Sequence, residues 1–390
     1  AARVFEYAGE HAQAAVLRME HARTVRDQGE RLDTLREGCA RNPGTTPAGR
    51  ALHHALAEAL LTEARTDDDD PARQRGLRLE AARALEEADD GASAGELYEG
   101  LGLLDLAARA YERGGEIARL ELVLAVLERR DAEDQQLTEL VRQVDTAIAD
   151  GQRREAHVLL TEHVARRERF GRALAPAVAQ RLRTLQQARP RGTRLTLKWN
   201  HGLTQIHSES RFRIGRAPDC DLVVPGARLS RHHVELSLDT SGETGPTLVA
   251  TDLGSKVGTF WDGLPLDPGV PEPIHTTSEL GLGMAASVTV VPVKGPQGHA
   301  YGALMRLSQA RSRPQVWSLY LPAGGPLVLA PEVVVPARLL FDRDWVLLDF
   351  ASGVGFSLGG RDLAPGQVVE LLLGDHLALA DAPLTLEVVT

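Results

Sequence analysis

The sequence predicts a multidomain protein of the α plus all-β class, in which an antiparallel helical-repeat domain precedes two antiparallel β-sandwiches. Three observations predict this class. Up to residue 188, Ala, Leu, Arg and Glu dominate and apolar residues recur at every third or fourth position, which is the period of an amphipathic helix. From residue 193 apolar residues alternate between Gly, Pro, Asp and Ser turns, which is typical of antiparallel strands. Because a motif at 252–263 recurs at 349–360, we expect domains at 1–188, 193–296 and 300–390.

The helical half contains an internal repeat. Phe5-Glu6, Gly9 and Ala14-Ala15 recur 93 residues later as Tyr98-Glu99, Gly102 and Ala107-Ala108. The stretch 97–116 resembles a tetratricopeptide-type repeat, in which an aromatic residue, a small residue and an Ala pair let antiparallel helices approach closely. Such helix pairs bury their apolar faces only by stacking, so we expect a solenoid that docks a further protein partner. The alternative is a helical spacer without a partner.

Pro190 and Gly192 mark the change from helices to strands, because neither residue is favoured inside a helix. Six runs of alternating pattern follow: RLTLKW, SRFRIG, DLVVP, HVELSL, TLVATDL and ASVTVVPV. Turn residues separate them. This is the pattern of an antiparallel sandwich.

Composition narrows the class of function. The 390 residues carry a net charge of -10 and only 4% aromatic residues, so neither charge nor stacking side chains favour nucleic acid. No apolar run reaches the roughly 18 residues of a membrane helix, and we expect no membrane partner. Cys39 and Cys220 lie in different halves, which excludes a disulfide scaffold and favours the reducing cytoplasm. Because Ala1 is not Met and a helical pattern is already under way, we expect the C-terminal part of a longer protein.

Neither catalysis nor metal binding is predicted. The histidines of the pairs His53-His54 and His232-His233 diverge on a helix or a strand, so they cannot readily share a metal ion. No catalytic elbow, P-loop or kinase signature occurs. The Gly-rich run 281–284 leads into a strand pattern, whereas a nucleotide fingerprint requires a helix. We expect a protein that is not an enzyme and that holds no cofactor and no metal.

The segment 212–263 carries the strongest functional signal. It places cationic, hydroxyl and Gly residues between strand-like runs, in Gly215-Arg216, Ser230-Arg231 and Lys256-Val257-Gly258. A guanidinium fork with a neighbouring hydroxyl and backbone N–H groups suits a doubly charged phosphoryl group. These residues therefore predict a phosphate-binding site on loops.

The order of these motifs resembles the forkhead-associated (FHA) domain, a β-sandwich module that recognises phosphothreonine in partner proteins. The resemblance rests on the Gly-Arg pair, Cys220-Asp221-Leu222, the Ser-Arg-x-His box at 230–233 and the block 252–260, and it covers 193–296. It implies that a phosphothreonine-containing protein binds through Arg216, Ser230, Arg231, Lys256, Val257 and Gly258. It also implies structural support of the site by Gly215, His233, Gly254 and Thr259.

One position departs from the family pattern. The family usually has Asn before the Gly of the last loop, and this chain has Val257. The missing amide ordinarily holds the backbone of the bound peptide. A neutral hydrogen bond contributes roughly 0.5–1.5 kcal/mol and a charge-assisted one roughly 1.5–3 kcal/mol. We therefore expect Val257 to weaken peptide binding by about tenfold without abolishing phosphate capture.

The third part, 300–390, resembles a second, degenerate FHA-like sandwich. DFASGVGFSLGG at 349–360 repeats DLGSKVGTFWDG at 252–263 with an offset of 97 residues. Leu329-Ala330 stands in the place of the Gly-Arg pair, and no Ser-Arg-x-His box occurs there. We expect this sandwich to bind no phosphate, and its removal from residue 298 onward to change peptide affinity by less than about twofold.

These features favour a phosphothreonine-dependent adaptor of bacterial Ser/Thr-kinase signalling. The alternative is a phospho-independent structural scaffold in a larger assembly. A third possibility is regulation in cis, with the site holding a phosphorylated Thr of an upstream region. The adaptor requires Arg216, Ser230 and Lys256 to meet on an open surface.

Overall fold

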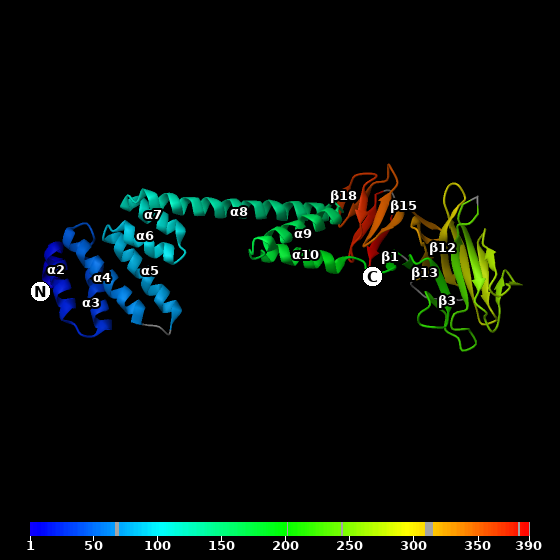
Figure 1. Ribbon diagram of the computed structural model, residues 1–390, viewed down its shortest axis with the longest axis horizontal. Helices are drawn as coiled ribbons and strands as arrows, with labels where there is room; N and C mark the ends of the chain where they lie inside the picture. Colours follow the sequence, from blue (N-terminus) through cyan, green and yellow to red (C-terminus); the bar gives the residue numbers. More distant parts are fainter. Residues whose placement is uncertain (67–69, 201, 243–244, 309–314, 381–382, 390) are drawn as a thin grey trace. The chain divides into compact units, whose positions relative to one another are not determined.

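The structure is a computed structural model, and it describes residues 1–66, 70–200, 202–242, 245–308, 315–380 and 383–389. The helices α1 to α10 precede the strands β1 to β21, as the sequence predicts (Figure 1). The chain divides into two compact units, Ala1–Leu137 and Thr138–Thr390, and α8 (Ile117–Ala149) runs across their boundary. No described helix is long and apolar enough to cross a membrane.

The first unit is built from antiparallel helices. Before α8 these are α1 (Ala2–Tyr7), α2 (His11–Thr24), α3 (Gln28–Arg41), α4 (Pro47–Thr66), α5 (Pro71–Glu87), α6 (Gly91–Gly100) and α7 (Leu104–Gly114). The repeat in the sequence corresponds to two helical hairpins. Gly9 (φ 77°) and Gly102 (φ 73°) form the left-handed turns between α1 and α2 and between α6 and α7. Ala14, Ala15 and Ala107 are fully buried just after these turns, where small side chains let the helices approach closely.

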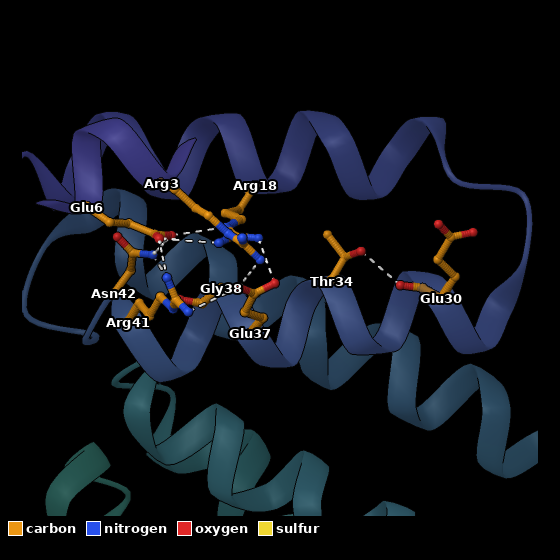
Figure 2. A network of polar contacts seen from close by, with 9 residues as sticks. All are labelled: Arg3, Glu6, Arg18, Glu30, Thr34, Glu37, Gly38, Arg41 and Asn42. Atoms are coloured by element: carbon orange, nitrogen blue, oxygen red, sulfur yellow. Dashed lines mark hydrogen bonds and ion pairs between the residues drawn. The ribbon is translucent and has the colours of Figure 1, made fainter. Parts of the chain in front are cut away.

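A buried ionic network joins α1 to α2 and α3 (Figure 2). Arg18, only 7% exposed, donates to both carboxylate oxygens of Glu6 at 3.0 and 3.2 Å and to Glu37 at 3.1 Å. Asn42 also donates to Glu6, at 3.3 Å. The hydrogen bond from Arg18 lowers the pKa of Glu6 despite burial. Because buried charges need partners, the ion pairs of Glu6 with Arg18 and Arg41 fix how α1 packs.

Among the described residues, the second unit contains two helices after α8 and three β-sheets. The helices are α9 (Arg153–Arg169) and α10 (Pro176–Ala188). The first eleven strands are β1 (Arg194–Trp199), β2 (Gly202–His207), β3 (Arg211–Gly215), β4 (Leu222–Val223), β5 (Val234–Asp239), β6 (Thr247–Asp252), β7 (Thr259–Trp261), β8 (Leu264–Pro265), β9 (Pro271–Pro273), β10 (Ser278–Leu282) and β11 (Ala286–Lys294). The others are β12 (Ala300–Leu307), β13 (Gln315–Tyr320), β14 (Gly325–Ala330), β15 (Val333–Asp342), β16 (Trp345–Phe350), β17 (Phe356–Leu358), β18 (Arg361–Leu363), β19 (Val368–Glu370), β20 (His376–Leu379) and β21 (Thr385–Val388).

The strand order shows how the sandwiches are assembled. A five-stranded sheet has the order β4-β3-β5-β6-β9, and a four-stranded sheet has the order β14-β15-β16-β19. The largest sheet has the order β18-β17-β20-β21-β1-β2-β13-β12-β11-β10-β7-β8. Different parts of this sheet pack against the two smaller sheets. One core joins the five-stranded sheet to β10 through β13, and another contains strands β14 to β21.

Strand pairing crosses the expected boundary between 193–296 and 300–390 in both directions. Strand β1 pairs with β21, and its Leu197 and Trp199 are buried in the C-terminal core. Conversely, β12 pairs with β11, and Met305 and Tyr320 of β12 and β13 are fully buried in the core of the five-stranded sheet. The domain bounds themselves stay a prediction, but neither segment completes its own core.

Candidate functional site

The first element of the site is the Gly-Arg pair at the end of β3. A Cβ on Gly215 would lie 2.2 Å from the carbonyl oxygen of Arg231, so only Gly allows the chain segments to approach this closely. The next residue, Arg216, is exposed, and its Nε donates to the carbonyl oxygen of Leu229 at 2.8 Å. Its backbone N–H donates to Ser230 O at 3.2 Å. The guanidinium is therefore anchored by one nitrogen against the loop that carries Ser230.

The second element links the loop after β4 to the loop after β6. The backbone N–H of Lys256 donates to Ser230 Oγ at 2.9 Å, which leaves the serine hydroxyl proton for another acceptor. The side chains of Arg231 and Lys256 are exposed and form no ion pair with any described residue. The structure thus brings Arg216, Ser230, Arg231 and Lys256 onto neighbouring loops at one end of the five-stranded sheet.

His233 is a buried residue that hydrogen-bonds to the segments carrying these loops. It is fully buried, its N–H donates to Ile214 O at 2.9 Å, and its carbonyl accepts from Leu253 N at 3.0 Å. Burial lowers the pKa of His233, so the ring is neutral at pH 7 and its Nε2–H donates to the carbonyl oxygen of Gly258 at 3.2 Å. Gly258 itself has φ 76°, a conformation that favours Gly.

A buried carboxylate shapes the loop after β6. Asp252 is 1% exposed and accepts from Ser255 N at 2.8 Å, from Ser255 Oγ at 2.7 Å and from Thr259 Oγ1. Burial acts to raise the pKa of Asp252, but these hydrogen bonds outweigh it and lower the pKa. Gly254, with φ 73°, lies between the two ends of this turn. Sequence reasoning assigned support to Gly254 and Thr259 but missed Asp252, although an Asp three residues before a Ser is a turn signal.

Val257 lies at the rim of the site. It is 37% exposed, and a Cβ on Gly283 would come within 2.5 Å of its Cγ2 atom. The side chain therefore leans on the turn between β10 and β11. An apolar side chain at this place offers no hydrogen bond to a peptide backbone.

His232 and Asp219 form a pair beside the site that the sequence did not predict. His232 Nε2 and Asp219 Oδ2 are 2.9 Å apart, and the hydrogen bond lowers the pKa of Asp219. With Cys220 they form the one group of potential metal ligands among the described residues. Burial, however, raises the pKa of the Cys220 thiol, and its Sγ contacts Arg231 O at 3.3 Å. The thiol is therefore protonated and packed against the backbone, which does not suit a metal ligand.

Comparison with known proteins identifies the module. The FHA domain family model matches residues 212–283. Similar solved structures include the MEK1 FHA domain in complex with a HOP1 phosphothreonine peptide, which is 21% identical with a TM-score of 0.19, over 23% of this chain and 87% of that one. The Mycobacterium tuberculosis Rv1747 FHA-1 structure is 22% identical with a TM-score of 0.17, over 24% of this chain and 86% of that one.

A third similar structure is the yeast Dun1 FHA domain in complex with a doubly phosphorylated peptide derived from Rad53. It is 17% identical with a TM-score of 0.20, over 32% of this chain and 82% of that one. No curated protein matches the chain. Because these TM-scores are low, the assignment rests on the family match. The second unit contains an FHA domain at residues 212–283.

Proposed function

We propose that the chain is a phosphothreonine-dependent adaptor, whose FHA domain captures a phosphorylated partner protein through Arg216, Ser230, Arg231 and Lys256. The observation that carries this proposal is the link from Lys256 N to Ser230 Oγ, at 2.9 Å, beside the anchored Arg216. This hydrogen bond holds the Ser230 hydroxyl, which can donate to a ligand, between exposed cationic side chains. Arg, Lys and hydroxyl donors together form charge-assisted hydrogen bonds with a phosphoryl group.

The charges around the loops support an anionic ligand. Asp219, in the loop between β3 and β4, contacts His232, and Asp221 contacts Arg194. Asp252 is buried under Ser255 and Thr259. The exposed cations of the site are therefore not neutralised by these carboxylates. Binding should depend on phosphorylation and should weaken as salt increases.

We further propose that the C-terminal strands form a second, degenerate FHA-like sandwich. The order β18-β17-β20-β21-β1-β2 beside β14-β15-β16-β19 repeats the order β8-β7-β10-β11-β12-β13 beside β3-β5-β6-β9. Leu329 and Ala330, in the place of Gly215-Arg216, are fully buried in β14. A buried apolar pair cannot contact phosphate, so we assign this sandwich a structural role.

The helical region would dock a second protein. The matching hairpins α1–α2 and α6–α7, with their left-handed Gly9 and Gly102, support a tetratricopeptide-like arrangement.

The two cysteines, Cys39 and Cys220, are both free, which suits a reducing cytoplasm. We place the adaptor in bacterial Ser/Thr-kinase signalling and assign it no catalytic activity.

The test is calorimetry of the intact chain with the best peptide from a phosphothreonine library. Arg216→Ala and Ser230→Ala should each weaken binding by roughly 1.5–3 kcal/mol, which is about 10- to 150-fold. Arg183→Ala is the matched control, because among the described residues this exposed arginine of α10 bonds only to its own helix, at Ala179 O. Unchanged affinity in Arg216→Ala and Ser230→Ala, with folding intact, would favour a phospho-independent scaffold.

A further inference from the structure

A second cationic hollow lies in the second unit, outside the FHA loops. One depression of about 640 Å³ is lined by Arg189, Arg191 and the turn between β15 and β16. An adjoining depression of about 550 Å³ extends from that turn to Arg154 of α9. The two share Arg189, Arg343, Asp344 and Trp345. We call this pair of depressions the arginine hollow.

The side chains that line the arginine hollow carry excess positive charge, and Glu209, which accepts from Thr193 Oγ1 at 2.7 Å, lies next to this lining. Its acidic residues, Asp342 and Asp344, are paired: Arg154 contacts Asp342 at 2.8 Å, and Arg189 contacts Asp344 at 3.4 Å. Arg191 bonds only to the carbonyl oxygen of Gln186, at 3.4 Å, within the part of the chain that the structure describes. No hydrogen bond or ion pair joins the Arg343 side chain to a described residue. Two guanidinium groups thus remain without a counter-charge, in a chain whose net charge is -10.

Arg343 is also held in an unfavourable backbone conformation. Asp342 pairs with Trp345 across the hairpin, so Arg343 is the first residue of a two-residue turn, and its φ is 53°. Gly, Asn or Asp is preferred at such a position because a longer side chain is strained there. No hydrogen bond or ion pair between the Arg343 side chain and a described residue offsets this strain. Strain without a structural benefit points to a functional role.

The wall and floor of the hollow are rigid. Arg189 stacks on Trp345, with its guanidinium carbon 4.4 Å from the ring centroid, and Trp345 is only 8% exposed. The backbone N–H of Leu373 donates to Ala188 O at 2.6 Å, which fixes the end of α10 against the loop between β19 and β20. Thr193 and Ser208 also line it, and their hydroxyls donate to Glu209 at 2.7 Å and to the carbonyl oxygen of Thr193 at 3.2 Å. A preformed cavity of this size suits a small molecule.

This hollow is distinct from the place where an FHA fold carries phosphate-binding loops. Strand β16 starts at Trp345, beside the hollow, and ends at Phe350, before the loop 351–355 that matches 254–258 of the first sandwich. The hollow and that loop therefore lie at opposite ends of the strand. We propose that the arginine hollow binds a small molecule that carries a diphosphate group, held by Arg191 and Arg343, because guanidinium forks match phosphoryl oxygens.

The test uses pyrophosphate and ADP as probes on the full chain, in an Arg216→Ala background that silences the FHA loops. Arg343→Gly is the key variant, because Gly relieves the turn while removing the cation. It should raise the melting temperature without ligand and weaken pyrophosphate binding by at least about tenfold. Arg191→Gln should weaken binding similarly, whereas Arg183→Ala should leave it unchanged.

Comparing the affinities for ADP and pyrophosphate shows whether the ligand is a nucleotide or a diphosphate alone. Tighter binding of ADP than of pyrophosphate, lost in the same variants, identifies a nucleotide. Equal binding identifies the diphosphate alone. The proposal is overturned if neither probe binds at millimolar concentration, or if Arg343→Gly and Arg191→Gln bind both probes as the parent does.

Discussion

Removal of residues 298–390 should unfold the FHA domain, which reverses the expectation from the sequence alone. The deleted segment contains β12 and β13, which lie next to β11 in the large sheet. Their Met305 and Tyr320 are fully buried in the same core as Phe212 and Ile214 of β3. The deletion therefore removes part of the core beneath the phosphate-binding loops.

The magnitude follows from these two side chains. Truncating a buried Met to Ala costs about 2–5 kcal/mol, and truncating a buried aromatic residue costs about 3–5 kcal/mol. Their combined loss, about 5–10 kcal/mol, is comparable with the whole stability of a domain, about 5–15 kcal/mol. Strand β11 would also lose the ladder that joins Val290 to Met305. Little net stability remains for a chain that ends at residue 297.

The assay compares truncated and full-length chains by urea denaturation and by phosphopeptide calorimetry. In the full chain, Met305→Ala should lower stability by about 2–5 kcal/mol. Val334→Ala, at a 62% exposed position of β15, is the control and should change it by under about 0.5 kcal/mol. A truncated chain with cooperative unfolding and unchanged peptide affinity would refute the reasoning, and would show that 193–296 completes its own core.

The remaining predictions concern the rim of the site and the helical unit. Val257→Asn should tighten phosphopeptide binding about 3- to 10-fold, by one neutral hydrogen bond; unchanged calorimetric affinity would mean that the loop departs from the family geometry. Arg18→Ala should cost about 1.5–3 kcal/mol in urea denaturation, because buried Glu6 loses its hydrogen bonds from Arg18 and keeps the longer ones from Asn42 and Arg41; a loss below about 1 kcal/mol would show that water reaches the pair. Because the folded pKa of Glu6 is lowered from 4.5, its contribution is present above pH 4.5 and is lost as pH falls through the folded pKa. The melting-temperature difference between the parent and Glu6→Gln should therefore shrink below pH 4.5, and a constant difference would contradict this.

The sequence was sufficient to predict the FHA domain because its loops carry local signals. Gly215 is required by one close backbone approach, and Gly258 by one positive φ. The spacing between Ser230 and Lys256 follows from the two strands β5 and β6 that separate them. Each of these signals lies within a short stretch of chain, where the residue types restrict the backbone directly.

The pairing partners of β1 and β12 could not be predicted in this way. Strand β1 alternates apolar and other residues and β12 is mostly apolar, and neither pattern says which sandwich the strand completes. The choice depends on how side chains such as Trp199 and Met305 fit cores built from residues far away in the sequence. The conformation of Arg343 was equally hidden, because Asp-Arg-Asp does not resemble the Gly- or Asn-containing turns that have a positive φ.

The central claim is that Arg216, Ser230 and Lys256 form a phosphothreonine-binding site. The most direct measurement is the ratio of Kd values for one peptide in its phosphorylated and unphosphorylated forms, by calorimetry on the intact chain at about 0.1 M and about 1 M salt. Two charge-assisted hydrogen bonds of roughly 1.5–3 kcal/mol each predict a preference of at least about 100-fold, reduced at the higher salt concentration. Equal affinity for the two forms at both salt concentrations would contradict the claim.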